Sequence, residues 1–178
     1  MKFSSRPAGP RWGTLAAVPI QLYVIRHAIA ADPTPERPDA ARPLTAEGRE
    51  KFVQAVRGAK HLGWRFDRLY HSPLVRAVQT AELLRPLLDG PALALPDLAR
   101  GPDEEMLAHL EGERVAVVGH EPHLGSLVAW LVAGDAERGE RFCFKKGGFA
   151  VLSGELRPGA MTLQGLVAPK LLRRIGSR

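Results

Sequence analysis

Two short apolar runs constrain the fold most strongly, because each ends abruptly at polar residues. Residues 22–25 stop at Arg26 and His27, and residues 115–118 lead through a glycine to His120. Short runs rich in Val, Ile and Leu are typical of strands buried on both faces of a parallel sheet. Burying a guanidinium beside an imidazole is costly unless an anion binds there. The pattern predicts a buried sheet with an anion site at its strand ends.

Helical and strand-like patterns alternate along the rest of the chain. A helix is expected after Thr45, which would be its N-cap, and to end near Gly63; another is expected after Ser72, also as N-cap, and to end near Arg85. Two more helices are expected at residues 103–110 and from Pro122 onward. The further strands are expected at residues 68–71, 92–95, 149–152 and 161–167, the last two as a hairpin-like pair. Alternation of this kind predicts an α/β fold: a three-layer α/β/α sandwich with a mainly parallel sheet.

Length and composition favour one globular domain over residues 20–178, preceded by a flexible extension at residues 1–19 that is rich in Pro, Gly, Ser and Arg. Cys143 is the only cysteine, which excludes a disulfide within the chain and a zinc cluster built on cysteines. A reducing, cytoplasmic location is expected. No run of 18 apolar residues occurs, so we expect no membrane partner.

The positive net charge of +6 is concentrated near the two ends of the chain. Residues 1–20 and 157–178 together carry eight basic residues and no acidic one, so residues 21–156 have a net charge of −2. A nucleic-acid-binding domain is expected to carry its basic charge on the folded body. We therefore expect no nucleic-acid partner, although the high isoelectric point keeps that alternative testable. The basic ends are interpreted as solvated tails.

Four residues with useful chemistry share one predicted location. Arg26 and His27 follow the first strand, Arg76 lies in the first turn of the helix after residues 68–71, and His120 follows a later strand. In a parallel sheet these strand ends lie at one edge, where helix N-termini favour phosphate. Arginine can hold phosphoryl oxygens in pairs, and a neutral imidazole, with a free pKa of about 6.5, is a competent nucleophile. A second histidine could stabilise charge on the phosphoryl group.

Four segments in sequence order resemble the signature segments of the histidine phosphatase superfamily, which includes the phosphoglycerate mutases. They are residues 22–28, 42–48, 72–81 and 118–123. Ala28 stands where a glycine is commoner, and this, with residues 169–173, is similar to the phosphohistidine phosphatase (SixA-like) branch. The resemblance implies a phosphoglycerate mutase-like fold, no metal and no cofactor. It also implies site residues: His27 as the phosphorylated nucleophile, His120 as the second histidine, and Arg26, Arg42 and Arg76 as phosphate ligands.

Two residue roles stay open. Arg42 lies in a proline-rich loop, residues 28–44, where a merely solvated role competes with phosphate binding. Larger members of the superfamily carry an acidic general acid in an insertion, but this chain is compact there. The remaining candidates for that acid are Asp97, Asp103, Glu104 and Glu105, and Asp103 fits equally well as a helix cap.

The expected reaction is two-step phosphoryl transfer to water through a phosphohistidine on His27. A phosphohistidine in a protein is the favoured substrate, because an imidazole nitrogen leaves more readily than an alkoxide and depends less on a general acid. The alternatives are a small phosphomonoester, such as a sugar or nucleotide phosphate, and a non-catalytic module that binds phosphate or a phosphopeptide. A mutase is disfavoured, because the chain is too short to supply a lid. The oligomeric state is left open.

Overall fold

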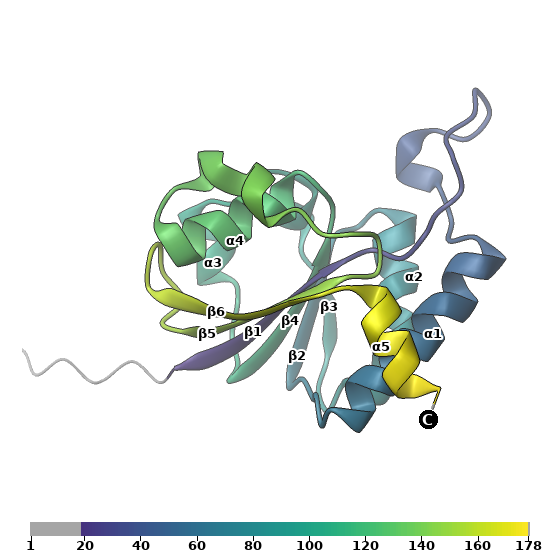
Figure 1. Ribbon diagram of the computed structural model, residues 1–178. Helices are drawn as coiled ribbons and strands as arrows, with labels where there is room; N and C mark the ends of the chain where they lie inside the picture. Colours follow the sequence, from purple (N-terminus) through teal and green to yellow (C-terminus); the bar gives the residue numbers. More distant parts are fainter. Residues whose placement is uncertain (1–18, 178) are drawn as a thin grey trace, which may run out of the picture.

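The computed structural model describes residues 19–177 and consists of one six-stranded sheet with helices on both faces (Figure 1). The strand order is β3-β2-β4-β1-β5-β6, and among these six strands β5 alone is antiparallel to the other five. This arrangement confirms the predicted three-layer α/β sandwich. The expected extension at residues 1–19 lies, except for Pro19, outside the described residues. The strands are β1 (Ile20–Arg26), β2 (Arg68–His71), β3 (Ala92–Ala94), β4 (Arg114–Gly119), β5 (Phe149–Gly154) and β6 (Met161–Val167).

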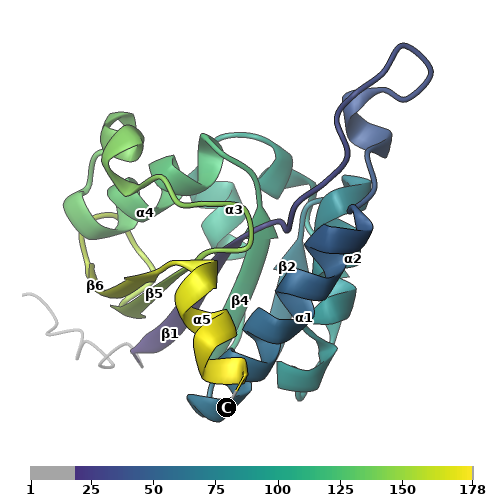
Figure 2. The ribbon, with the colours of Figure 1, turned by 45° about the vertical axis from the view of Figure 1, so that its right-hand side comes forward.

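The helices divide between the two faces of the sheet (Figures 1 and 2). One face carries α1 (Ala46–His61), α2 (Val75–Leu83) and α5 (Pro169–Gly176), and the other carries α3 (Glu104–Ala108) and α4 (His123–Ala133). Short 3₁₀ turns complete the connections: η1 (Asp39–Ala41), η2 (Arg85–Leu87), η3 (Pro96–Ala99) and η4 (Ala136–Phe142). The β1–α1 connection, which contains η1, projects away from the body of the domain.

Two hydrophobic cores, one on each side of the sheet, hold these layers together. Side chains of β1 alternate between them, so Tyr23 and Ile25 pack under α1 while Leu22 and Val24 pack under α4. All four are almost completely buried, and burying a side chain of this size contributes about 1.5–3 kcal/mol. The central strand is therefore fixed from both faces, which fixes the position of the residues at its end.

The first helix forms as its sequence predicts. Thr45 is the N-cap, and its Oγ1 accepts the Gly48 N–H at 2.9 Å. Phe52 and Val56 lie on the buried face, and Gly63, with a φ of +74°, follows the end of the helix. The capping oxygen satisfies a backbone donor that would otherwise lack an intrahelical partner.

The predicted N-cap of the second helix is wrong. Helix α2 begins at Val75, and its N-cap is Leu74, which has no side-chain cap. Ser72 continues the β2 ladder instead, because its N–H donates to the Val118 carbonyl at 3.0 Å. Its hydroxyl lies 2.8 Å from His120 Nε2 and so belongs to the functional site.

The C-terminal segment is not a solvated tail, which corrects the sequence-based expectation. Residues 161–167 form β6, as the sequence predicts, but the residues after it form α5, which packs closely against α1 with Leu172 buried between them. Gly58 permits this approach, since a Cβ there would lie 2.0 Å from the Leu172 carbonyl oxygen. The basic residues of α5 are consequently held in place on the folded surface.

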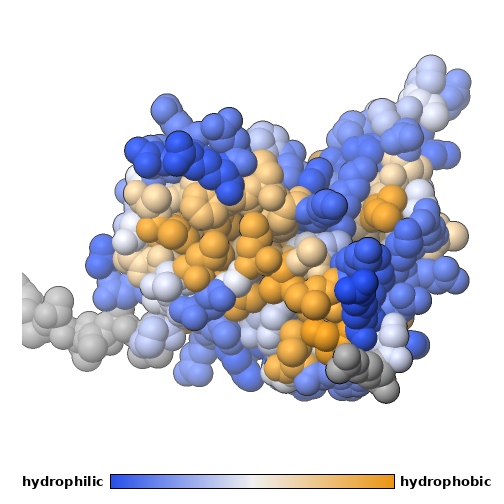
Figure 3. Space-filling model, viewed as in Figure 1, coloured by the Kyte–Doolittle hydropathy of each residue, from blue (hydrophilic) through white to orange (hydrophobic). Residues whose placement is uncertain are grey.

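The surface seen in Figure 3 carries a patch of hydrophobic side chains. Among the exposed hydrophobic residues, Leu166 of the edge strand β6 and Leu171 of α5 are about half exposed. Over residues 19–177, none of the helices combines the length and the apolar character needed to cross a lipid bilayer.

Candidate active site

The carboxyl ends of β1, β2 and β4 lie level with one another. Arg26 pairs with Gly119 in the parallel register, and the His27 N–H donates to the Gly119 carbonyl at 3.1 Å. The Ser72 N–H makes the equivalent bond one strand away. His27, Ser72 and His120 therefore all leave the sheet at one edge, as parallel pairing requires. The two imidazole rings have centroids 5.1 Å apart.

The hydrogen bonds of His27 determine which of its ring nitrogens can react. Its Nδ1 lies 2.7 Å from the Ala28 carbonyl oxygen, and because a carbonyl can only accept, Nδ1 carries the proton. The lone pair is therefore on Nε2. The Ala28 N–H donates to Thr80 Oγ1, which in turn donates to the Arg76 carbonyl at 2.6 Å. This chain of bonds holds the backbone beside His27 in a fixed position relative to α2.

Arg76 and Arg42 lie side by side and share one carboxylate. Arg76 is 5% exposed, and its Nη1 and Nη2 donate to the backbone carbonyl and the carboxylate of Asp39 at 2.7 and 2.9 Å. Arg42 Nε and Nη2 lie 2.9 and 2.8 Å from the other carboxylate oxygen. Two guanidinium groups thus surround a single anionic group, the geometry that a phosphoryl group needs.

Arg26, at the end of β1, is held by a different segment of the chain. Its Nη1 donates to the Phe144 carbonyl at 2.7 Å. Phe144 is fixed in turn by Glu121, whose Oε1 accepts the Phe144 N–H at 3.0 Å. The Glu121 carboxylate, just before α4, therefore positions Arg26 at the end of β1 through the Phe144 backbone.

Unpartnered buried atoms cluster at this site. Across residues 19–177, four buried side-chain nitrogen or oxygen atoms lack a hydrogen-bond partner. Three belong to the site, namely Arg26 Nε, Arg76 Nε and His120 Nδ1; the fourth is Asp67 Oδ1, outside it. Leaving such a group unsatisfied costs about 1–3 kcal/mol, so buried polar atoms are normally paired. Their concentration here indicates a site built for an anion that accepts hydrogen bonds.

Burial and positive charge keep both histidines neutral at pH 7. Burial, together with the charges of Arg76, Arg26 and Lys146, lowers the pKa of His27 to about 4 against the opposing effect of the Ala28 carbonyl. Burial also lowers the pKa of His120 to about 3, with Arg76 and the His27 ring contributing. A neutral His27 is the nucleophilic form. A bound phosphoryl dianion would raise the pKa of His120 and so favour its protonation.

These pKa directions predict how stability depends on pH. Both folded-state values lie below the ordinary 6.5, so the unfolded chain binds more protons between about pH 4 and pH 6.5. The free energy of unfolding therefore falls as the pH is lowered through that window. We expect His27→Asn to lose less stability than the unmodified protein between pH 7 and pH 5, as measured by urea unfolding. An equal or larger loss in the variant would contradict the assignment.

The four candidate acids have other roles or lie on the surface. Asp103 caps α3, its Oδ1 accepting the Met106 N–H at 2.7 Å, and Asp97 forms an ion pair with Arg100. Glu104 and Glu105 are exposed in the first turn of α3. None of the four forms a hydrogen bond with either histidine. Within residues 19–177, no group of three His, Cys, Asp or Glu side chains is arranged to hold a metal ion.

Sequence reasoning missed Asp39, Ser72, Thr80, Glu121 and Lys146 as parts of the site. Asp39 had a usable signal, because it lies three residues before Arg42, a spacing at which an acidic and a basic side chain can pair across a helical turn. The sequence predicts Ser72 as a helix cap, whereas its hydroxyl contacts His120. The others act through contacts between segments far apart in the chain, which no local pattern reveals.

Fold and site together define an α/β phosphatase. The family model described as "Histidine phosphatase superfamily (branch 1)" matches residues 22–99. Phosphohistidine phosphatase SixA of Escherichia coli is 33% identical over 125 residues, which are 65% of this chain and 76% of SixA. The chain belongs to the histidine phosphatase superfamily, and its relatives place it in the SixA-like branch.

Two further comparisons cover more of this chain. An uncharacterised protein of Picosynechococcus is 35% identical over 153 residues, or 82% of this chain and 89% of that protein. The solved structure of the protein histidine phosphatase SixA complexed with tungstate superimposes with a TM-score of 0.73 at 28% identity, covering 86% of this chain and 99% of the other.

Proposed function

We propose that this phosphatase hydrolyses phosphohistidine in a protein through a phosphohistidine intermediate on His27, using protein groups alone. The observation that carries the proposal is the cluster of unpartnered Arg26, Arg76 and His120 nitrogens around a nucleophile whose tautomer leaves Nε2 free. Donors already in place around a transferring phosphoryl group supply most of the acceleration in such reactions.

The first step forms a bond between His27 Nε2 and phosphorus and breaks the bond from phosphorus to the leaving group. Arg26, Arg42 and Arg76 hold the phosphoryl oxygens, with Arg42 and Arg76 releasing Asp39 to do so. Water then attacks the phosphoenzyme, the nitrogen–phosphorus bond breaks, and His27 returns to its neutral form. His120, whose ring centroid lies 5.1 Å from that of His27, donates a hydrogen bond to the phosphoryl group and so assists the attack of water, whose proton leaves on the product phosphate.

The local acids favour a leaving group that does not need strong protonation. Asp39 is the acid that contacts the phosphate-binding arginines; although its partial burial acts to raise its pKa, the charges and hydrogen bonds of Arg76 and Arg42 hold that pKa below the ordinary value. An ionised carboxylate cannot protonate an alkoxide. The histidine nitrogen of a phosphohistidine leaves more readily, which is why we favour it over a phosphomonoester. The SixA relative, a phosphohistidine phosphatase by name, supports the same choice.

A matched pair of peptides tests the proposal. Two peptides of one sequence would carry either phosphohistidine or phosphoserine, and kcat/KM would be measured for each. We expect a preference of at least about 100-fold for phosphohistidine, because only that leaving group dispenses with a general acid. Quenching in alkali, which preserves phosphohistidine, should trap label on His27. A protein that binds both peptides without becoming labelled would be a binding module, and a preference for phosphoserine would reverse the substrate assignment.

A further inference from the structure

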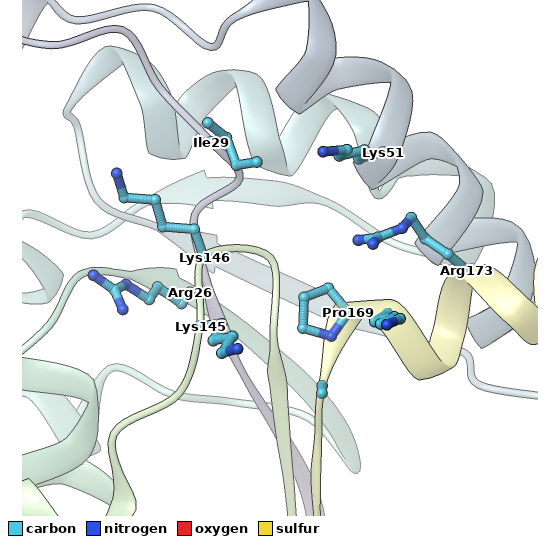
Figure 4. Close-up of a pocket in the computed structure, with 9 residues that line it drawn as sticks. Arg26, Ile29, Lys51, Lys145, Lys146, Pro169 and Arg173 are labelled. Carbon is cyan, nitrogen blue, oxygen red and sulfur yellow. The ribbon is translucent and has the colours of Figure 1, made fainter.

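A strongly cationic groove adjoins the active site. It encloses about 530 Å³ and is lined by three apolar residues and six basic ones (Figure 4). The apolar lining consists of Ile29, Ala168 and Pro169; the basic lining consists of Arg26, Lys51, Lys145, Lys146, Lys170 and Arg173. No acidic residue lines it. Arg26 belongs both to this groove and to the phosphate site, so the two are continuous.

Four separate parts of the fold supply the charges, and Arg26 comes from the end of β1. Lys51 and Arg173 reach in from α1 and α5, and the turn that carries Lys145 and Lys146 faces them (Figure 4). That turn is fixed to the end of β1, because the Gly147 N–H lies 3.0 Å from the carbonyl oxygens of both Arg26 and His27. Gly147 has a φ of +77°, which other residues rarely adopt. The turn is therefore held in a defined conformation at the edge of the site.

Most of these cations have no counter-charge. Lys51 pairs with Glu47, but among the described residues the other five form no ion pair. Five unpaired cations around one hollow repel one another, and a ligand carrying several negative charges relieves that repulsion. Lys146 also contributes to the low pKa of His27, so the positive electrostatic potential of the groove extends to the proposed nucleophile.

We propose that the groove binds acidic side chains of a protein substrate that flank its phosphorylated residue. This inference rests on the proposed function and specifies its substrate class. Aspartate and glutamate side chains match the lysine and arginine heads, and the apolar floor of Ile29 and Pro169 accommodates the intervening chain. A nucleotide fits less well, because none of the lining residues is aromatic and so none offers a surface for base stacking.

The test compares two phosphohistidine peptides that differ only in their flanks, one with Asp and Glu and the other with Asn and Gln. We expect the unmodified protein to prefer the acidic peptide by about tenfold in kcat/KM at low salt, with the preference shrinking as salt is added. The exposed pair Lys145→Glu/Lys170→Glu should bring the ratio of the two values to about one or below. Thermal unfolding of the variant checks that its fold is retained.

A matched control carries the same change of charge elsewhere. Lys60→Glu/Arg85→Glu alters two exposed cations of a different groove, between α1 and α2, and should leave the ratio unchanged. Equal rates for the two peptides in the unmodified protein, or an equal effect of the control, would overturn the inference about the groove. Failure to hydrolyse either peptide would overturn the proposed function instead. In that case the unphosphorylated acidic peptide must still inhibit hydrolysis of a small phosphomonoester for the groove assignment to stand.

Discussion

Replacing His27 with Asn should abolish phosphatase turnover, lowering kcat by roughly 10⁴- to 10⁶-fold, because the covalent route then has no nucleophile. Asparagine has a similar shape and can still donate toward the Ala28 carbonyl, so the pocket should keep its geometry. Steady-state hydrolysis of a phosphohistidine peptide measures the loss, and labelling after an alkaline quench should disappear with it.

Two controls separate chemistry from folding in that experiment. His109→Asn changes an exposed histidine on α3's C-cap and should leave kcat unchanged. The His27→Asn protein should still bind inorganic tungstate, since the arginines are intact. Persistent turnover in His27→Asn, with label on another residue, would remove the nucleophile assignment while leaving the anion site in place.

Replacing Arg76 with Ala should produce the second-largest loss. Its two Nη groups are placed to donate two charge-assisted hydrogen bonds to one anion, and each bond contributes about 1.5–3 kcal/mol. Losing both corresponds to about 3–6 kcal/mol, or roughly 10²- to 10⁴-fold in kcat/KM. Steady-state kinetics with the phosphohistidine peptide measures it, and urea unfolding records the separate cost of leaving a buried space beside Asp39.

Conservative and neighbouring variants sharpen that result. Arg76→Lys keeps the charge but loses the planar fork, so it should recover only part of the activity. Arg42→Ala should cost less than Arg76→Ala, because the Arg42 side chain, at 13% exposed, is less buried than that of Arg76, at 6%. A larger loss for Arg42 than for Arg76 would reverse the assigned order of the two ligands.

The parts of the fold that the sequence predicts are those governed by local chemistry. The apolar runs at residues 22–25 and 115–118 predict buried strands, and Thr45 is a typical N-cap that predicts the helix after it. Helix α5 was missed because its eight residues are rich in lysine and arginine, and its stability depends on packing Leu172 against Gly58 of α1. That contact joins segments more than a hundred residues apart.

Some residues of the site could likewise be predicted from local sequence, and others depend on the tertiary fold. Parallel register alone was enough to expect His27 and His120 at one edge, with Arg76 at the adjoining helix. Ser72 was misassigned because a serine before a proline fits a helix cap, and only the pairing of β2 with β4 shows that its hydroxyl faces His120. The five unpaired cations of the groove come from β1, the turn before β5, and α5, so their meeting is a property of the tertiary fold.

The carboxylate that Arg42 and Arg76 share has a consequence for how salt affects catalysis. Asp39 offsets one of the two positive charges of the pair while no phosphoryl group is bound, so arrival of a phosphoryl group exchanges one anion for another. Few dissolved anions need be expelled from these two arginines during that exchange. Binding of the phosphoryl group by Arg42 and Arg76 should therefore depend less on ionic strength than binding of acidic side chains in the cationic groove, where five of the six cations have no ion-pair partner among the described residues.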